Sequence, residues 1–314
     1  MDLDVIGMQS FRIFDSLLII STTDKDGLWS FFSLEDNRYL GKLIRKGNGP
    51  NEFVQSPFVS NAFFWKKDSL LFADIYDFQK GAMYKLNVGE SLRKGNACMS
   101  EYSVSLPPFL FNYAMLDSVS YFIREIDNAE TQQTRSLFIN GVKEVPHNAA
   151  LLNRSMIQRG EDFNILSVLM KCNREKRLIV EAPITLNYLN LYSAEGDWGK
   201  TICVDDKVDN ISRIQERSRP DRYYTYGDLC VYSDFWAALY INEDNMTYQM
   251  GRKKLPVIQV FDWEGNPMAE LKLPAFATSF DIDLQHGYLY TLDLETDEFC
   301  RYGVRNILQD IKGN

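Results

Sequence analysis

The chain has 314 residues, of which 45% are hydrophobic and 13% aromatic, so it holds enough apolar material for a large core. Its 34 basic and 43 acidic side chains give a formal net charge of −9, which repels phosphate backbones and disfavours nucleic acid as a partner. No stretch approaches the roughly 18 apolar residues that a membrane-spanning helix needs. The five cysteines include no Cys-x-x-Cys pair, which disfavours a disulfide framework and a zinc knuckle.

A strand pattern recurs along the chain, and each copy begins at an acidic or polar corner. Asp15-Ser16-Leu17-Leu18-Ile19-Ile20 is nearly repeated as Asp68-Ser69-Leu70-Leu71-Phe72-Ala73, and fainter copies begin at residues 117, 175, 234 and 286. A period near fifty residues made of short strands is typical of a propeller, because a single four-stranded sheet cannot bury both faces until neighbouring sheets stack around an axis. We therefore predict an all-β fold, a six-bladed β-propeller of four-stranded antiparallel blades around a central channel, forming one domain over residues 1–314.

The first and last units illustrate the expected strands. Residues 12–21, 28–34 and 39–45 form the first unit, and residues 288–293 and 298–304 the last. Because the last unit has no clear fourth strand, we expect the amino-terminal segment to close the ring by pairing with it, which would remove two open sheet edges.

A glycine-rich loop joins the first two units, with the sequence Gly47-Asn48-Gly49-Pro50-Asn51-Glu52-Phe53. We expect a structural role for it. Gly47 and Gly49 would take positive φ, Pro50 would fix the following turn, Glu52 would accept backbone N–H bonds, and Phe53 would fill the seam between two sheets.

Together with its flanks, residues 43–53 and Ser56-Pro57, this loop resembles the Gly-x-Gly-Pro-x-Glu-Phe segment of the TolB-like six-bladed propeller proteins of Bacteroidetes, which are similar in shape to NHL-repeat propellers. The similarity extends to the Asp-Ser-Leu-Leu corners and to residues 280–293. The resemblance implies a six-bladed propeller that is usually exported to the periplasm or cell surface and often lipid-anchored, with no assigned activity. The first residues lack a basic and then apolar leader, so the alternatives are a cytoplasmic protein or a targeting segment that has been removed.

Polar, arginine-bearing insertions interrupt the repeat at residues 148–162 and 205–226, and a shorter one at residues 242–254 reads as an exposed flap. Guanidinium groups can bind a carboxylate through two hydrogen bonds, and tyrosines offer contact area at low entropic cost. The alternative is a solvated surface excursion with paired charges. The ligand-binding candidates are Arg213, Arg217, Arg219, Arg222, Tyr223, Tyr224 and Tyr226.

Carboxylates recur in the turns after the second strands, and such oxygen ligands suit calcium. An acidic, solvated rim is the alternative, because turns favour Asp in any case. The candidate metal ligands are Asp74, Asp77, Asp127 and Asp293.

Signatures of catalysis are missing from the sequence. Two histidines in unrelated contexts exclude a His-Glu-x-x-His zinc site, and there is no Gly-x-Ser-x-Gly nucleophile motif. We therefore predict no catalytic residues and no cofactor. The favoured function is a non-enzymatic binding propeller that engages a protein, peptide or glycan through its inter-blade loops. The alternative is a calcium-dependent hydrolase or lactonase with its metal in the central channel.

Overall fold

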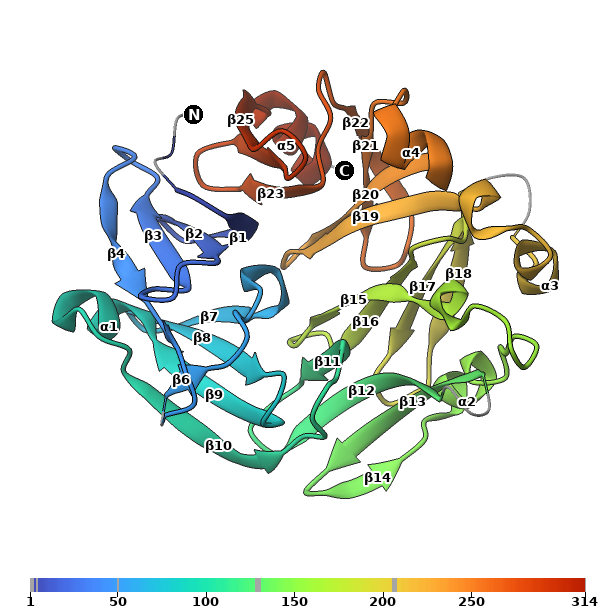
Figure 1. Cartoon of the computed structure of the whole chain (residues 1–314), viewed down its shortest axis with the longest axis horizontal. Coiled ribbons are helices and arrows are strands. Elements are labelled where there is room, and N and C mark those ends of the chain that lie inside the picture. Colours follow the sequence, from blue (N-terminus) through green and yellow to red (C-terminus); the bar gives the residue numbers. More distant parts are fainter. Residues whose placement is uncertain (1–2, 4, 50, 128–130, 205–207, 314) are drawn as a thin grey trace. The chain divides into compact units, whose positions relative to one another are not determined.

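The computed structural model describes every residue except 1–2, 4, 50, 128–130, 205–207 and 314. Its contacts divide the chain into two compact units, residues 1–109 with 277–314 (unit 1) and residues 110–276 (unit 2). Both units consist mainly of antiparallel sheets in which the strands pair in chain order (Figure 1). A single domain over the whole chain stays a prediction.

Unit 1 contains three sheets, blades 1, 2 and 6. Blade 1 comprises β1 (Met8–Phe14), β2 (Leu17–Thr22), β3 (Trp29–Ser33) and β4 (Tyr39–Leu43). The linker to blade 2 contains β5 (Arg45–Lys46), β6 (Glu52–Phe53) and the 3-10 turn η1 (Val59–Asn61). Blade 2 comprises β7 (Phe63–Lys67), β8 (Leu70–Asp77), β9 (Ala82–Asn87), α1 (Val88–Lys94) and β10 (Met99–Ser105). Blade 6 comprises β23 (Ser279–Asp283), β24 (Tyr288–Asp293) and β25 (Glu298–Gly303), and α5 (Arg305–Gly313) follows it.

Unit 2 contains blades 3, 4 and 5. Blade 3 comprises β11 (Asn112–Met115), β12 (Ser120–Asp127), β13 (Gln132–Ile139) and β14 (Val142–Glu144), and is followed by α2 (His147–Leu152) and η2 (Phe163–Leu166). Blade 4 comprises β15 (Val168–Asn173), β16 (Leu178–Pro183), β17 (Tyr188–Ser193) and β18 (Gly199–Cys203), and is followed by α3 (Ile211–Gln215) and η3 (Arg219–Asp221). Blade 5 comprises β19 (Tyr223–Val231), β20 (Phe235–Asp244), α4 (Asn245–Gly251), β21 (Val257–Asp262) and β22 (Pro267–Lys272).

The predicted fold class, an all-β six-bladed propeller, is confirmed, with three differences in detail. Blade 6 has three strands, and α5 follows where a fourth was expected. The amino-terminal segment does not pair with blade 6 but supplies β1, the first strand of blade 1. Residues 12–21 also form two strands and not one, because Asp15 adopts φ 55° and turns the chain into a hairpin. The six recurring copies therefore mark the hairpin into the second strand of each blade.

Apolar side chains fill the seams between neighbouring blades within each unit. In unit 1, Phe11 and Ile20 of blade 1 share a cluster with Leu292 of blade 6. In unit 2, one cluster joins blades 3 and 4 and another joins blades 4 and 5. Since most of the large side chains in these clusters are fully buried, seam packing is the main source of stability.

The loop between blades 1 and 2 has the structural role expected of it, although the glycines act for a different reason. Neither Gly47 nor Gly49 has positive φ; that conformation falls to Asn51. A Cβ atom at Gly47 would lie 2.0 Å from Glu52 Oε2, so glycine is needed for the close approach of this carboxylate. Glu52 accepts the Gly49 N–H at 2.9 Å, as predicted, and Pro50 lies outside the described residues.

Phe53 is 1% exposed and belongs to the apolar cluster between blades 1 and 2, where its ring meets Tyr84 edge-on at 5.6 Å. We expect Phe53→Ala to lower the free energy of unfolding by about 3–5 kcal/mol, because it removes buried apolar surface and leaves a cavity. Chemical denaturation measures this loss. Phe53→Leu is the matched control and should retain most of the stability; equal stability of wild type and Phe53→Ala would contradict the assignment.

Candidate binding pocket in blades 3 and 4

The two long insertions of unit 2 pack against each other. Insertion 1 (residues 148–162) contributes Ile157, and insertion 2 (residues 205–226) contributes Ile214, to one apolar cluster. The Gln158 N–H donates to Gln215 Oε1 at 3.1 Å, which adds a polar link between the two. The described parts of the two insertions are therefore joined by buried contacts, although most side chains of residues 208–221 are exposed.

Insertion 1 lies beside blade 3 because the outer strand of that blade is short. β14 pairs only with Leu137–Ile139 of β13, so the rest of the β13 edge has no strand beside it. Insertion 1 takes that place: Gln132 forms a bridge with Met156, and the Arg135 N–H donates to Asn153 Oδ1 at 2.8 Å. A sheet edge that would otherwise expose unpaired backbone groups is thereby covered.

A pocket of about 510 Å³ lies where this edge, blade 4 and both insertions meet. Its lining is mostly polar, and the apolar members are few. The lining residues are Gln133, Arg135, Leu152, Ser155, Tyr188, Asn190, Thr201, Val208, Asp209, Asn210 and Ile211.

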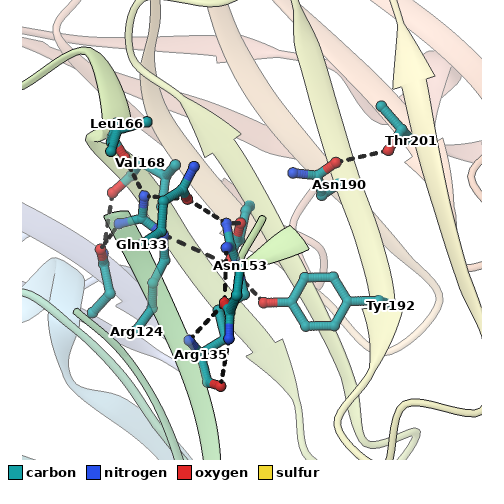
Figure 2. A network of polar contacts seen from close by, with 11 residues as sticks. Arg124, Gln133, Arg135, Asn153, Leu166, Val168, Asn190, Tyr192 and Thr201 are labelled. Carbon is teal, nitrogen blue, oxygen red and sulfur yellow. Dashed lines mark hydrogen bonds and ion pairs between the residues drawn. The ribbon is translucent and has the colours of Figure 1, made fainter. Parts of the chain in front are cut away.

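Behind the pocket lies a buried charge cluster that joins blades 3 and 4 (Figure 2). Arg135 donates from Nε and Nη2 to the two oxygens of Glu181 at 2.7 and 2.6 Å. Arg124 lies 3.9 Å from Glu181 through Nε and donates from Nη2 to Gln133 Oε1 at 2.8 Å. Tyr192 donates its hydroxyl to Glu181 at 2.6 Å. The three charged side chains are each no more than 2% exposed.

The pKa shifts of the cluster follow from burial and from its charges. Burial by itself would raise the pKa of Glu181, but the charge and hydrogen bonds of Arg135, with Arg124 and Tyr192, outweigh burial and lower this pKa to about 2. Burial lowers the pKa of Arg124 to about 10, against the attraction of Glu181. All three groups are therefore charged at neutral pH, and the cluster carries one positive charge in excess.

Hydrogen bonds also fix the orientation of the polar groups that line the pocket. Gln133 Oε1 accepts from both arginines, at 2.8 and 2.6 Å, so its amide nitrogen must face away from them. Asn190 Oδ1 accepts from the Thr201 hydroxyl at 2.9 Å, and Figure 2 shows its nitrogen on the opposite side. Asp209 Oδ2 accepts the Asn187 N–H at 2.8 Å.

Tyr188 contributes a hydroxyl to the lining and is held through its ring. That ring packs against the apolar cluster to which Ile157 and Ile214 of the two insertions belong, together with Ile165, Leu166 and Leu186. Burial raises the pKa of Tyr188 to about 12, so its hydroxyl is a neutral donor at physiological pH.

The arginines and tyrosines predicted to bind a ligand fall into two groups, and none of them lines this pocket. Arg222 is buried and pairs with Asp162 at 2.8 Å, Tyr226 is fully buried in the seam of blades 4 and 5, and the Tyr224 ring packs on Tyr248. Arg222 and Tyr226 are thus buried and not on the surface where we expected them, whereas Tyr224 is partly exposed and its role in binding stays a prediction. The others are exposed, and their role in binding stays a prediction: Arg213, Arg217, Arg219 and Tyr223.

Of the predicted metal-binding acids, Asp77, Asp127 and Asp293 end second strands, whereas Asp74 lies within β8 and not in the turn after it. Asp74 accepts from the Trp65 and Tyr102 side chains at 3.0 and 2.8 Å. Asp77 accepts the backbone N–H groups of Gln79 and Lys80, and Asp293 those of the following turn. Asp127 is exposed at the end of β12. Among the described residues, no group of three or more His, Cys, Asp or Glu side chains is arranged to hold a metal ion, and the calcium hypothesis stays a prediction.

The pocket and the charge cluster behind it were not predicted from the sequence. The signal for the cluster is a lone carboxylate, Glu181, inside the otherwise apolar run of β16, combined with Arg124 and Arg135 inside two strands of the preceding unit. A charge in the middle of a central strand needs a partner of opposite sign, and the adjacent blade supplies two.

No family model matches the sequence, and no curated protein matches it significantly. Solved structures are similar in fold. A member of the DUF4221 family from Bacteroides vulgatus matches with a TM-score of 0.54 and 13% identity, over 96% of each chain. The Kuenenia stuttgartiensis hydrazine synthase matches with a TM-score of 0.50 and 9% identity, over all of this chain and 81% of that chain. At such identities the likeness shows the fold alone, so the TolB-like and NHL-like assignment stays a prediction. No helix in the described part of the chain is long and apolar enough to cross a membrane.

Glu181 links stability to pH. Because its pKa falls from 4.5 to about 2 on folding, its stabilising contribution is complete above about pH 4.5 and is lost as the pH falls towards 2. We expect Glu181→Gln to lower the free energy of unfolding at pH 7 by about 3–5 kcal/mol, since two buried guanidinium groups lose their counter-charge. It should also flatten the pH dependence of stability between pH 4.5 and 2.

Denaturant unfolding at a series of pH values measures both effects. Glu195→Gln, which breaks a half-exposed pair with Arg177, is the control and should cost no more than about 1 kcal/mol. A steep pH dependence that persists in Glu181→Gln would show that other carboxylates dominate acid unfolding.

Truncation of Arg222 should lower the stability of the fold much more than truncation of Arg213. Arg222→Ala removes the bond to Asp162 and a donor to the Arg217 carbonyl oxygen, so we expect a loss of about 2–3 kcal/mol. Arg213→Ala, at an exposed position of α3, should change stability by less than about 0.5 kcal/mol. Thermal unfolding of both variants checks this; equal melting temperatures would mean that Arg222 does not link the insertions.

Proposed function

We propose that this chain is a non-enzymatic binding propeller whose ligand occupies the pocket formed by blades 3 and 4 and insertions 1 and 2. The observation that carries the proposal is that both insertions, which depart from the repeat, contribute to one polar cavity. Ser155 comes from the first insertion, and Asp209 and Asn210 come from the second. Loops that depart from a repeated scaffold are where such folds usually carry recognition.

Size and construction support this assignment. A volume of about 510 Å³ lies within the range of roughly 300–1,000 Å³ that is common for small-molecule pockets. Several lining groups are already held in place by hydrogen bonds to the scaffold, as Asn190 and Asp209 are. A pocket whose polar groups are fixed before binding loses little conformational entropy when a ligand enters.

The lining favours binding over catalysis. Among the described residues that line it there is one carboxylate, Asp209, and no histidine to act as a base for a hydroxyl nucleophile. The ligand class consistent with this lining is a glycan, a peptide end or a side chain presented by a partner protein. By its resemblance to exported propellers we propose a periplasmic or cell-surface location.

Filling the cavity should abolish binding and leave the fold intact. We expect a ligand identified from a panel of oligosaccharides and peptides by thermal shift to raise the melting temperature of the wild type but not that of Ser155→Trp. The indole would occupy the pocket from insertion 1. Ligand at one hundred times its dissociation constant stabilises the folded state by about 2.7 kcal/mol, which a thermal shift detects.

Ser100→Trp, at an exposed position of β10 in unit 1, is the matched control and should keep the full shift. A ligand that stabilises Ser155→Trp as strongly as the wild type would place the binding site elsewhere. Turnover of lactones or esters that depends on added calcium would replace the binding function with the hydrolase alternative.

A further inference from the structure

We infer that the pocket binds a small polyhydroxylated carboxylic acid, the chemistry of a sugar acid, with its carboxylate against Arg135 and Gln133 and its hydroxyls on Tyr188, Asn190 and Asp209. The inference rests on the proposed function and specifies its ligand. Three features support it: the excess positive charge of the buried cluster, two hydrogen-bond donors at the pocket wall, and several lining groups that can form hydrogen bonds with hydroxyls.

The charge cluster is one negative charge short. Two guanidinium groups share the single carboxylate of Glu181, which already accepts three hydrogen bonds: Oε1 accepts from Arg135 and Tyr192, and Oε2 accepts from Arg135. Arg124 Nε is buried without a hydrogen-bond partner. An uncompensated charge in a dry site is costly, so an anion bound nearby gains more from this charge than it would gain in water.

Arg135 and Gln133 bring this excess to the wall of the pocket. A guanidinium has five N–H donors, and four hydrogen bonds of Arg135 go to Glu181, Gln133 and Asn153, which leaves one Nη1 donor without a bond among the described residues. The Gln133 amide nitrogen must point away from the arginines, because guanidinium groups offer no acceptor. The wall thus presents two donors beside a positive charge, which is the arrangement that a carboxylate accepts.

The remaining lining suits hydroxyl groups. A sugar hydroxyl both donates and accepts, and Asn190 offers its amide nitrogen, Tyr188 a neutral hydroxyl, and Asp209 an acceptor. Asp209 would repel a ligand that was only anionic but favours one that also carries hydroxyl donors. Leu152, Val208 and Ile211 supply the fully apolar part of the lining, and the side chains that can form hydrogen bonds outnumber them. The polyhydroxylated acid therefore fits better than a peptide.

The experiment is calorimetric titration of the full chain with D-galacturonate, with its methyl ester and with acetate. The ester keeps the ring and hydroxyls without the charge, and acetate keeps the charge without the hydroxyls. We expect the acid to bind at least tenfold more tightly than the ester and than acetate.

Gln133→Glu provides the sharpest variant. One carboxylate oxygen would keep both arginine contacts, and the other would replace the amide donor, so the excess positive charge disappears. We expect the variant to fold with undiminished melting temperature and to bind galacturonate at least tenfold more weakly. Gln215→Glu is the matched control: it adds the same charge to insertion 2, outside the lining, and its oxygen still accepts the Gln158 N–H. It should bind within about threefold of wild type.

Tyr188→Phe keeps the packed ring and removes one hydroxyl, so it tests the hydroxyl contacts should Gln133→Glu fail to fold; binding should weaken several-fold. Equal affinity for the acid and the ester, unchanged binding by Gln133→Glu, or no binding of galacturonate at all would overturn the inference. If another ligand then shifted the wild type and control but not Ser155→Trp, the proposed function would stand without it.

Discussion

The arrangement of blades 3 and 4 depends on one carboxylate, that of Glu181. It lies in a central strand with no exposed surface, and its charge is compatible with that place only because Arg135 and Arg124 reach it from the neighbouring blade. The apolar seam would tolerate small shifts between the two sheets, since hydrophobic contact has no direction. The bidentate hydrogen bond from Arg135 would not tolerate such shifts, because both oxygens of Glu181 must stay at hydrogen-bond distance. The cluster thereby fixes the register of one blade against the next, and with it the wall of the pocket.

The pocket itself follows from the length of one strand. β14 pairs only with the carboxyl-terminal residues of β13, Leu137–Ile139. The backbone groups of the earlier β13 residues therefore need another partner on that edge. Insertion 1 provides it through Asn153 and Met156, and insertion 2 is held to insertion 1 by the contact of Ile157 with the cluster around Ile214. A full-length outer strand would fill this space with regular sheet. Because β14 is short and insertions 1 and 2 lie beside it, a cavity remains next to the buried charge cluster.

The sequence was sufficient for the fold class because the hairpin corners recur. Asp15 and Asp68 adopt the same positive φ at equivalent corners, so a local rule identifies the unit. The structural role of the loop that ends at Phe53 could be predicted from the sequence, but the reason for its glycine could not. A Cβ atom at position 47 would clash with Glu52, and sequence spacing does not reveal that contact. The candidate site was out of reach for a similar reason. Arg124 and Arg135 face each other across the β12–β13 hairpin, but Glu181 follows Arg135 by 46 residues, and only the stacking of two blades brings it to them.

The chain carries a net charge of −9, yet the buried cluster behind its candidate pocket carries one positive charge in excess, and the fields of the surface and of the cluster act over different distances. At physiological ionic strength charges in solvent are screened beyond about 8 Å, so the acidic surface discourages anions mainly at close approach to the exterior. The guanidinium excess lies inside the protein, where screening is weak and the effective dielectric is low. For the acidic ligand proposed above, we therefore expect slow approach, and strong retention only if it fits the cavity and reaches Arg135. A negative surface around a positive buried cluster favours selective binding over fast association, because the surface repels anions that cannot enter the pocket.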